Sequence, residues 1–176
     1  HPRNPKTGKG ENKAEWFEEA VVPIKEQCDI IVNVSTGGTG KRVDGEWLFK
    51  EVPEESVEGR LSVVPALAKN PLAKPDLASF NAGSPVIDIY NRKKKDFLLK
   101  FVMVHSFPDM VHMAEVMKAN NVKPELECYD IGMINNAKVL AEMGHLEQPL
   151  YFQCVMGILG QIPATVDNLL HMVRNI

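Results

Sequence analysis

The chain has 176 residues, a length that suits one domain and allows a substantial core without disulfide bonds. Apolar residues make up 44% and charged residues 24%, a balance that excludes intrinsic disorder, collagen-like repeats and coiled-coil fibres. The net charge is −3, so no basic excess favours nucleic acid or an anionic membrane surface as a partner. The apolar stretches are shorter than the roughly 18 residues that predict a membrane-spanning helix.

The three cysteines, Cys28, Cys128 and Cys154, are too few for a secreted disulfide framework and lack the spacing of a zinc knuckle. We expect them to be reduced core residues of a cytoplasmic protein. The sequence starts at His1, with neither a methionine nor a signal peptide, and stops at Ile176 within a helical pattern. We therefore expect both ends to be cut.

Short apolar runs that predict strands recur along the chain, each followed by a turn or a polar residue. They are found at residues 29–35, 77–81, 124–129 and 150–156. A further run at 97–105 fits either a strand or part of a helix. Residues 40–51 are predicted to be a polar loop insertion.

Helical patterns fill the gaps between the strands, at 16–22, 53–68, 108–120, 130–143 and 166–176. Asn12 and Glu15 form a capping-box pair before the first of them. Pro65 is expected to kink the second helix or end it early. Gly144 is a predicted C-cap and Thr165 a predicted N-cap.

This alternation of strand and helix is typical of an α/β protein with a parallel sheet. An open doubly wound sheet and a TIM (β/α)8 barrel are the two alternatives. The barrel is favoured, because no GxGxxG or Walker A motif is present and polar residues recur at the carboxyl ends of strands. About four βα units are present where a barrel needs eight. We therefore expect residues 1–176 to be a single domain that covers roughly the middle half of a barrel, incomplete at both ends.

Ser35, Thr36, Gly37 and Gly38 follow the first predicted strand. Glycines at such a position let backbone N–H groups approach an anion, and the hydroxyls add further donors. The alternative is an ordinary tight turn between a strand and a helix.

Two further strands carry polar pairs with a spacing of two, which places each pair on one face. Ser79 and Asn81 form the first pair, and Glu125 and Glu127 form the second. Buried polar groups need partners, so the Ser/Asn pair is difficult to explain as core. Glu127 is the better candidate of the two carboxylates, because it is nearer the carboxyl end of its strand; a salt bridge to a neighbouring strand is the alternative.

His1 is a potential zinc ligand, although a histidine at a chain end is more often a surface residue. No ligand spacing relates the other histidines, which are His105, His112, His145 and His171. We expect none of these four to bind a metal.

Several motifs occur together in one order: HPRNPKTGKG, NVSTGG, LASFNAGS, KPELECYDIGM, PLYFQCVMGILGQIPAT and NLLHMV. Over essentially the whole chain they resemble the β-keto acid cleavage enzyme family. The resemblance implies a TIM barrel, usually a homodimer or homotetramer, with one zinc ion held by an HxH motif and a late glutamate. It also implies a retro-Claisen acyl transfer between a β-keto acid and acetyl-CoA, which gives acetoacetate and a new acyl-CoA.

By position, the resemblance implies that His1 is the second histidine of HxH and binds zinc. It implies that Ser35 and Gly38 contact substrate, in a loop that also holds Thr36 and Gly37. Ser35 and the backbone of this loop could donate hydrogen bonds to a carboxylate or to a developing oxyanion.

Ser79 and Asn81 resemble substrate-contacting positions of the family, and Glu127 resembles an active-site carboxylate that holds a polar network or moves a proton. Ser79 stands where many members have threonine, and Gly160-Gln161 stands where two glycines are common. The remaining zinc ligands and the general base would lie outside this chain. Another metal-dependent TIM-barrel aldolase or lyase, or a catalytically inactive interaction subunit, are the alternative functions.

Overall fold

The computed structural model describes residues 1–176 except 9, 38–40, 44–45, 49–55 and 100–101. In chain order the elements are α1 (Ala14–Gln27), β1 (Asn33–Val34), β2 (Lys41–Val43), β3 (Glu46–Leu48), α2 (Val57–Leu61), α3 (Val63–Leu67), β4 (Leu77–Asn81), β5 (Ile89–Asn91), β6 (Asp96–Leu99), α4 (Phe107–Ala119), β7 (Lys123–Cys128), α5 (Ile131–Glu142), β8 (Tyr151–Cys154) and α6 (Val166–Val173). Among these described elements, no helix is both long enough and apolar enough to cross a membrane.

Within the described residues, β1, β4, β7 and β8 form one parallel sheet in that order. The order and the direction confirm the sheet predicted from the four apolar runs. The first strand is shorter than its predicted range of 29–35. Its neighbour β4 begins opposite Asn33, at Leu77, so residues 29–32 have no strand residue beside them.

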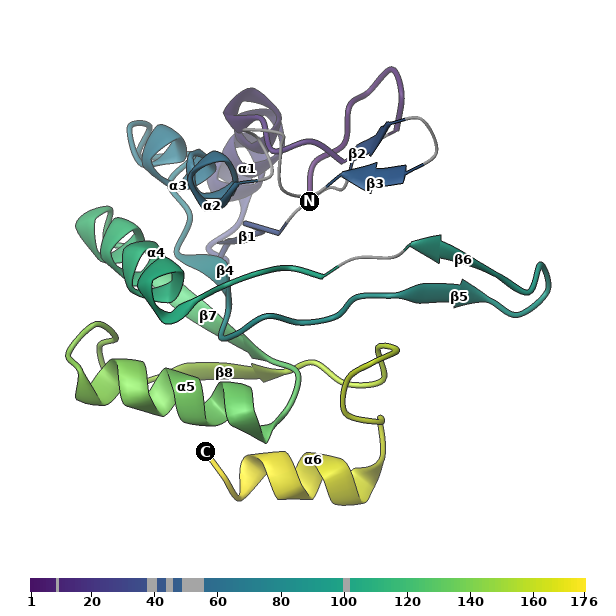
Figure 1. Ribbon diagram of the computed structural model, residues 1–176. Helices are drawn as coiled ribbons and strands as arrows, with labels where there is room; N and C mark the ends of the chain where they lie inside the picture. Colours follow the sequence, from purple (N-terminus) through teal and green to yellow (C-terminus); the bar gives the residue numbers. More distant parts are fainter. Residues whose placement is uncertain (9, 38–40, 44–45, 49–55, 100–101) are drawn as a thin grey trace.

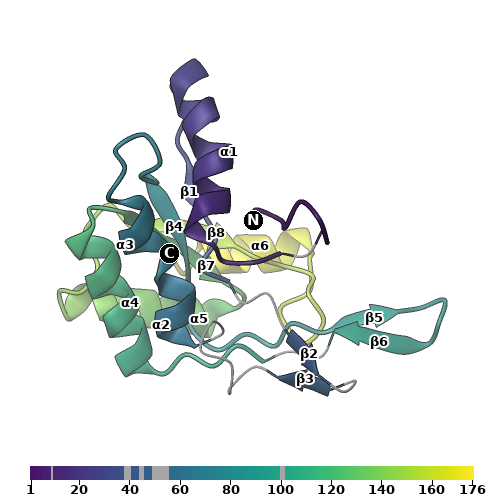
Figure 2. The same ribbon diagram turned by 90° about the horizontal axis from the view of Figure 1, so that it is seen from above.

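The sheet has one apolar face, because successive residues of a strand point to opposite sides. Its side chains are those of Val34, Ala78, Phe80, Leu126 and Cys128, all of them buried. They share a core cluster with Leu67 of α3, Met113 of α4 and Ala137 of α5. Figures 1 and 2 show these three helices along the same side of the sheet.

The opposite face of the sheet is polar. The paired positions there are Asn33, Ser79, Asn81, Lys123, Glu125, Glu127, Tyr151 and Gln153, with one apolar residue, Leu77, among them. Burial on this face is greatest on β4 and decreases toward both edges of the sheet, since Asn33 is exposed on β1 and the side chain of Tyr151 on β8 is 49% exposed. The sheet therefore uses alternate residues for helix packing and for polar contacts.

The helix predicted at 53–68 is two short helices, α2 and α3, that meet at Ser62. The break agrees with the expected effect of Pro65, the third residue of α3. Proline has no N–H to donate to the carbonyl of Leu61, so one continuous helix would lose a hydrogen bond there.

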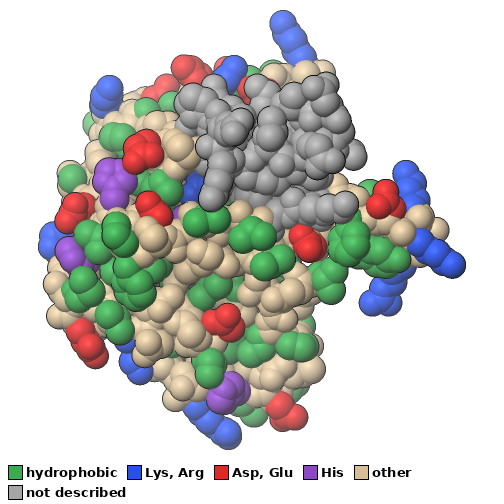
Figure 3. Space-filling view, in the orientation of Figure 1, with side chains coloured by type: hydrophobic (Ala, Val, Ile, Leu, Met, Phe, Trp, Pro, Cys, Tyr) green, Lys and Arg blue, Asp and Glu red, His purple; other side chains and the backbone are tan. Residues whose placement is uncertain are grey.

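The run 97–105 contains β6, which pairs with β5 in an antiparallel hairpin outside the parallel sheet. The hairpin projects from the body in Figures 1 and 2, and Figure 3 shows Lys and Arg side chains at its tip, which the sequence places at residues 92–95. The predicted insertion at 40–51 holds a second hairpin, β2–β3, and its other residues lie outside the described part of the chain.

The expected capping box of the first helix is wrong. Lys13, not Asn12, is the N-cap of α1, and a lysine side chain has no oxygen to accept from the N–H groups of the first turn. The Asn12 amide donates to the carbonyl of Gly37, 3.0 Å away. The predicted N-cap at Thr165 is confirmed. The C-cap of α5 is Met143, and Gly144, the predicted C-cap, follows it with a φ of 85°. Cys28 is also exposed, which corrects its expected place in the core, although all three cysteines are free thiols.

Candidate active site at the carboxyl end of the sheet

The predicted site residues converge at one end of the sheet. Asn81 of β4 lies directly beside Glu127 of β7 in the strand register, and Ser79 lies beside Glu125. The backbone N–H of Thr36, which follows β1, donates to Ser79 Oγ at 2.9 Å. The first, second and third strands of the sheet therefore bring their polar ends together, as the sequence predicted.

Thr36 and Ser79 form a buried pair that fixes β1 against β4. Thr36 Oγ1 donates to the carbonyl of Ser79 at 2.7 Å and lies 3.3 Å from Ser79 Oγ. Both residues are buried, and a buried donor or acceptor without a partner lowers the free energy of unfolding. The hydrogen bonds of the pair therefore stabilise the contact between the end of β1 and β4. Contact of Thr36 with a substrate stays a prediction.

Ser35 and Gly37 form the turn after β1. Ser35 Oγ accepts a hydrogen bond from the Gly37 N–H at 3.0 Å, which leaves the serine proton available for another acceptor. A Cβ atom placed on Gly37 would lie 3.2 Å from Ser35 Oγ and 3.9 Å from Cε1 of His1. A side chain at Gly37 would therefore crowd the Ser35 hydroxyl, whereas its contact with His1 would be an ordinary van der Waals contact. Gly38 lies outside the described residues.

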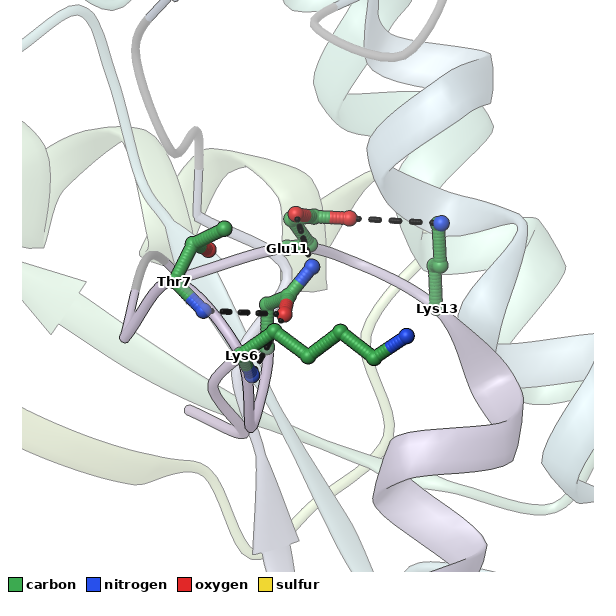
Figure 4. A network of polar contacts seen from close by, with 5 residues as sticks. Lys6, Thr7, Glu11 and Lys13 are labelled. Atoms are coloured by element: carbon green, nitrogen blue, oxygen red, sulfur yellow. Dashed lines mark hydrogen bonds and ion pairs between the residues drawn. The ribbon is translucent and has the colours of Figure 1, made fainter.

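The segment that carries His1 has its own polar network, drawn in Figure 4. Asn4 Oδ1 accepts from the N–H groups of Lys6 and Thr7, and the Asn4 amide donates to Glu11 at 3.0 Å. Glu11 also pairs with Lys13 at 3.3 Å. Together with the bond from Asn12 to Gly37, these contacts hold the exposed His1 beside the turn.

Glu127 lies in surroundings that favour its neutral form. Burial, and then the charge of Glu125, raise the pKa of Glu127 from the usual 4.5 to about 7. The hydroxyl of Tyr129 donates to Glu127 Oε2 at 3.3 Å and acts in the opposite direction. A carboxyl group with a pKa near neutrality can both take up and release a proton at physiological pH.

Glu125 has a different partner, the side-chain amide of Asn33 on β1. This contact crosses β4, from Asn33, which lies beside Leu77, to Glu125, which lies beside Ser79. Asn33 and Tyr129 belong to the site but were not predicted from the sequence. The available signal was spacing, because Asn33 is two residues before Ser35 and Tyr129 is two residues after Glu127.

Asn81 is 2% exposed, and its Oδ1 atom has no hydrogen-bond partner among the described residues. A buried acceptor without a donor is costly unless a ligand or water supplies one. Asn81 therefore offers an acceptor beside Glu127, in addition to the hydroxyl donor at Ser35.

A metal site needs several ligand side chains close together. The described residues contain no group of three His, Cys, Asp or Glu side chains that could hold a metal ion. A catalytic zinc site takes three protein ligands, and the resemblance assigns one of them, His1, to this chain. The described residues therefore do not form a zinc site by themselves.

An α/β protein with a polar site at the carboxyl end of a parallel sheet is the class that this geometry defines. The chain belongs to the β-keto acid cleavage enzyme family, whose model matches residues 1–176. This match confirms the resemblance found in the motifs.

Three relatives illustrate the range of the family. The chain is 28% identical to the 3,5-dioxohexanoate:acetyl-CoA acetone transferase of Paraburkholderia graminis, over 99% of the chain and 54% of that protein. It is 31% identical to the 3-keto-5-aminohexanoate cleavage enzyme of Acetoanaerobium sticklandii, over 92% of the chain and 49% of that protein. It is 26% identical to the 3-dehydrocarnitine:acetyl-CoA trimethylamine transferase of Rhizobium meliloti, over the whole chain and 56% of that protein. The chain thus spans about half the length of these curated relatives.

Proposed function

We propose that the protein is an acyltransferase that passes an acyl group between a β-keto acid and acetyl-CoA, with acetoacetate and a new acyl-CoA as products. Family membership and the substrates in the names of the relatives support this reaction. The observation that carries the proposal is the convergence of Ser35, Asn81 and Glu127 at one end of the sheet.

Each residue has a role that follows from its contacts. Ser35 has a hydroxyl proton to donate to a substrate carbonyl or carboxylate oxygen, since its lone pair already accepts from Gly37. Asn81 Oδ1 accepts a hydrogen bond from substrate. Glu127 holds or moves a proton near neutral pH, as its raised pKa allows.

The proposed architecture is a TIM barrel, of which these residues form roughly the middle half as a single domain. The placement of α3, α4 and α5 on one side of the sheet supports the barrel, with the polar face toward its interior. A doubly wound sheet has helices on both faces, and that arrangement suits the exposed polar face of β8 less well.

Zinc is part of the proposal, with His1 as one ligand and the other ligands outside this chain. When bound, zinc would act as a Lewis acid that polarises the keto oxygen of the substrate. Metal analysis of the full-length protein tests this part: one zinc per subunit, lost in a His1→Ala variant, supports it, and a metal-free active enzyme contradicts it. A cytoplasmic homodimer or homotetramer stays a prediction, which light scattering and cell fractionation can check.

The decisive experiment incubates the full-length protein with acetyl-CoA and a panel of β-keto acids and measures acetoacetate. Glu127→Gln is expected to lower kcat by about a hundred- to ten-thousand-fold, the range typical of a lost proton-transfer group, while Tm does not fall. Glu147→Gln, on the exposed surface, is the matched control. If no β-keto acid gives acetoacetate, the proposed reaction is wrong. If Glu127→Gln turns over normally but melts early, Glu127 is structural.

A further inference from the structure

Two buried side chains without an assigned role lie next to the candidate site. Arg60 of α2 and His105, which precedes α4, are each 5% exposed. Arg60 Nη2 and His105 Nε2 are 2.5 Å apart. On its other side, His105 Nδ1 lies 3.2 Å from the backbone carbonyl of Asn81.

These contacts define where the proton of His105 lies. The guanidinium of Arg60 can only donate, so Nε2 of His105 must accept. The carbonyl of Asn81 can only accept, so Nδ1 must carry the proton. His105 is therefore a neutral ring in a single tautomer.

The electrostatic surroundings agree with a neutral ring. Burial, and then the charge of Arg60, lower the pKa of His105 from 6.5 to about 4. The carbonyls of Asn81 and Gly83 and the carboxylate of Asp109 act in the opposite direction, but the first two effects are larger. The ring therefore stays neutral throughout the physiological pH range.

A second set of contacts locks His105 to the chain that leaves β4. Ser84 Oγ accepts from the His105 N–H at 2.9 Å and donates to the His105 carbonyl at 3.0 Å. Ser106, the next residue, caps α4 with a reciprocal bond pair to Asp109. His105 thus joins the end of β4, α2 and the start of α4.

We propose that His105 is a positioning residue that holds the carbonyl of Asn81, so that Asn81 Oδ1 points at the substrate. This inference rests on the proposed function. The side-chain oxygen of Asn81 lacks a partner among the described residues, whereas its backbone carbonyl is held. Arg60 fixes the ring from the opposite side, so both ring nitrogens are used.

Two substitutions in the full-length protein separate the two contacts of the ring. Asparagine places its amide N–H near the position of Nδ1, whereas glutamine reaches the position of Nε2 and leaves Nδ1 vacant. His105→Asn is expected to retain most of kcat/KM, and His105→Gln to lower kcat/KM roughly ten- to a hundredfold, as a lost buried hydrogen bond predicts. Both variants are expected to have similar Tm values. His112→Gln, on the exposed side of α4, is the control and is expected to match the wild type.

A spectroscopic measurement gives a second readout. The ¹⁵N chemical shifts of the wild-type ring are expected to show the neutral Nδ1–H tautomer at pH 6. A charged ring or the Nε2–H tautomer overturns the proposal, as do equal kcat/KM values for the two His105 variants. If the wild type forms no acetoacetate, the proposed function fails together with the positioning role; if it is active and His105→Gln matches it, the positioning role fails by itself.

Discussion

Glu125 and Glu127 lie two residues apart on the same face of β7, but their partners give them different chemistry. The Glu125 carboxylate accepts a hydrogen bond from the amide of Asn33. Among the described hydrogen bonds, the Glu127 carboxylate accepts only a long one, from the hydroxyl of Tyr129 at 3.3 Å. Burial and the charge of Glu125 then raise the pKa of Glu127 to about 7. One carboxylate therefore serves the structure of the sheet, and its charge tunes the protonation of the other.

The raised pKa of Glu127 predicts a pH dependence of stability. Between pH 4.5 and about 7 the folded protein holds a proton that the unfolded chain has lost. The contribution of Glu127 to the free energy of unfolding should therefore decrease as pH rises through this range and level off above it. His105, whose pKa is lowered from 6.5 to about 4, contributes in the opposite direction below pH 6.5, so the effect of Glu127 is read from the difference between the wild type and Glu127→Gln. Glu127→Gln lacks the contribution of the Glu127 carboxyl. The free energy of unfolding of the variant, relative to that of the wild type, should therefore rise by about 1–3 kcal/mol from pH 5 to pH 8. Urea unfolding of both proteins at pH 5 and pH 8 checks this. The same difference in free energy of unfolding at the two pH values would contradict the prediction.

At the scale of elements, the turn after β8 depends on a glycine. Gly157 has a φ of 83°, and its N–H donates to the carbonyl of Ile162 at 2.9 Å. A Cβ atom at this position would lie 3.0 Å from Cβ of Ala164. The turn therefore combines a left-handed backbone with a close side-chain approach.

Gly157→Ala should destabilise the protein more than Gly144→Ala. Gly144 has a similar φ of 85°, but a Cβ atom there meets nothing within 4 Å. We expect a loss of about 1–2 kcal/mol for Gly144→Ala from the backbone conformation, and a further loss of about 1 kcal/mol or more for Gly157→Ala from the steric contact. Denaturant unfolding of both variants measures this, and equal losses would show that Ala164 moves freely.

Local patterns in the sequence predicted the sheet and much of the site. Apolar runs with polar residues two apart identified β4 and β7, and they placed Ser79, Asn81 and Glu127 on one face. The contact of Arg60 with His105 joins residues 45 positions apart, so no local pattern could reveal it. The length of β1 was overestimated, as residues 29–35, because the apolar run extends beyond the two residues that pair with β4.

The capping error and the unpredicted hairpin have the same cause. Asn12 is a residue type that caps helices, but α1 begins one position too late for that role, and the Asn12 amide donates to the carbonyl of Gly37 in a distant part of the chain. The strand β5 is three residues long, too short for a periodic signal, and it is defined by its pairing with β6. Tertiary contacts decided both cases.

At the scale of the whole molecule, the described residues supply one proposed zinc ligand, His1, and no group of three. The isolated 176 residues are therefore expected to bind no stoichiometric zinc at a three-ligand site and to form no acetoacetate from acetyl-CoA and a β-keto acid. Equilibrium dialysis followed by metal analysis, and the acetoacetate assay, check both expectations. Tight binding of one zinc per chain would mean that the ligands include histidines such as His105 or His145.

The division of the sheet into an apolar and a polar face has a consequence for how such a protein can change over evolutionary time. Positions 78, 80, 126 and 128 hold the helices, and the positions between them carry the polar side chains. A mutation at Gln153 or Tyr151 alters the polar surface and leaves the buried helix contacts of Phe80 and Leu126 in place. The exposed part of the polar face can therefore change one residue at a time without loss of the helix contacts that stabilise the fold.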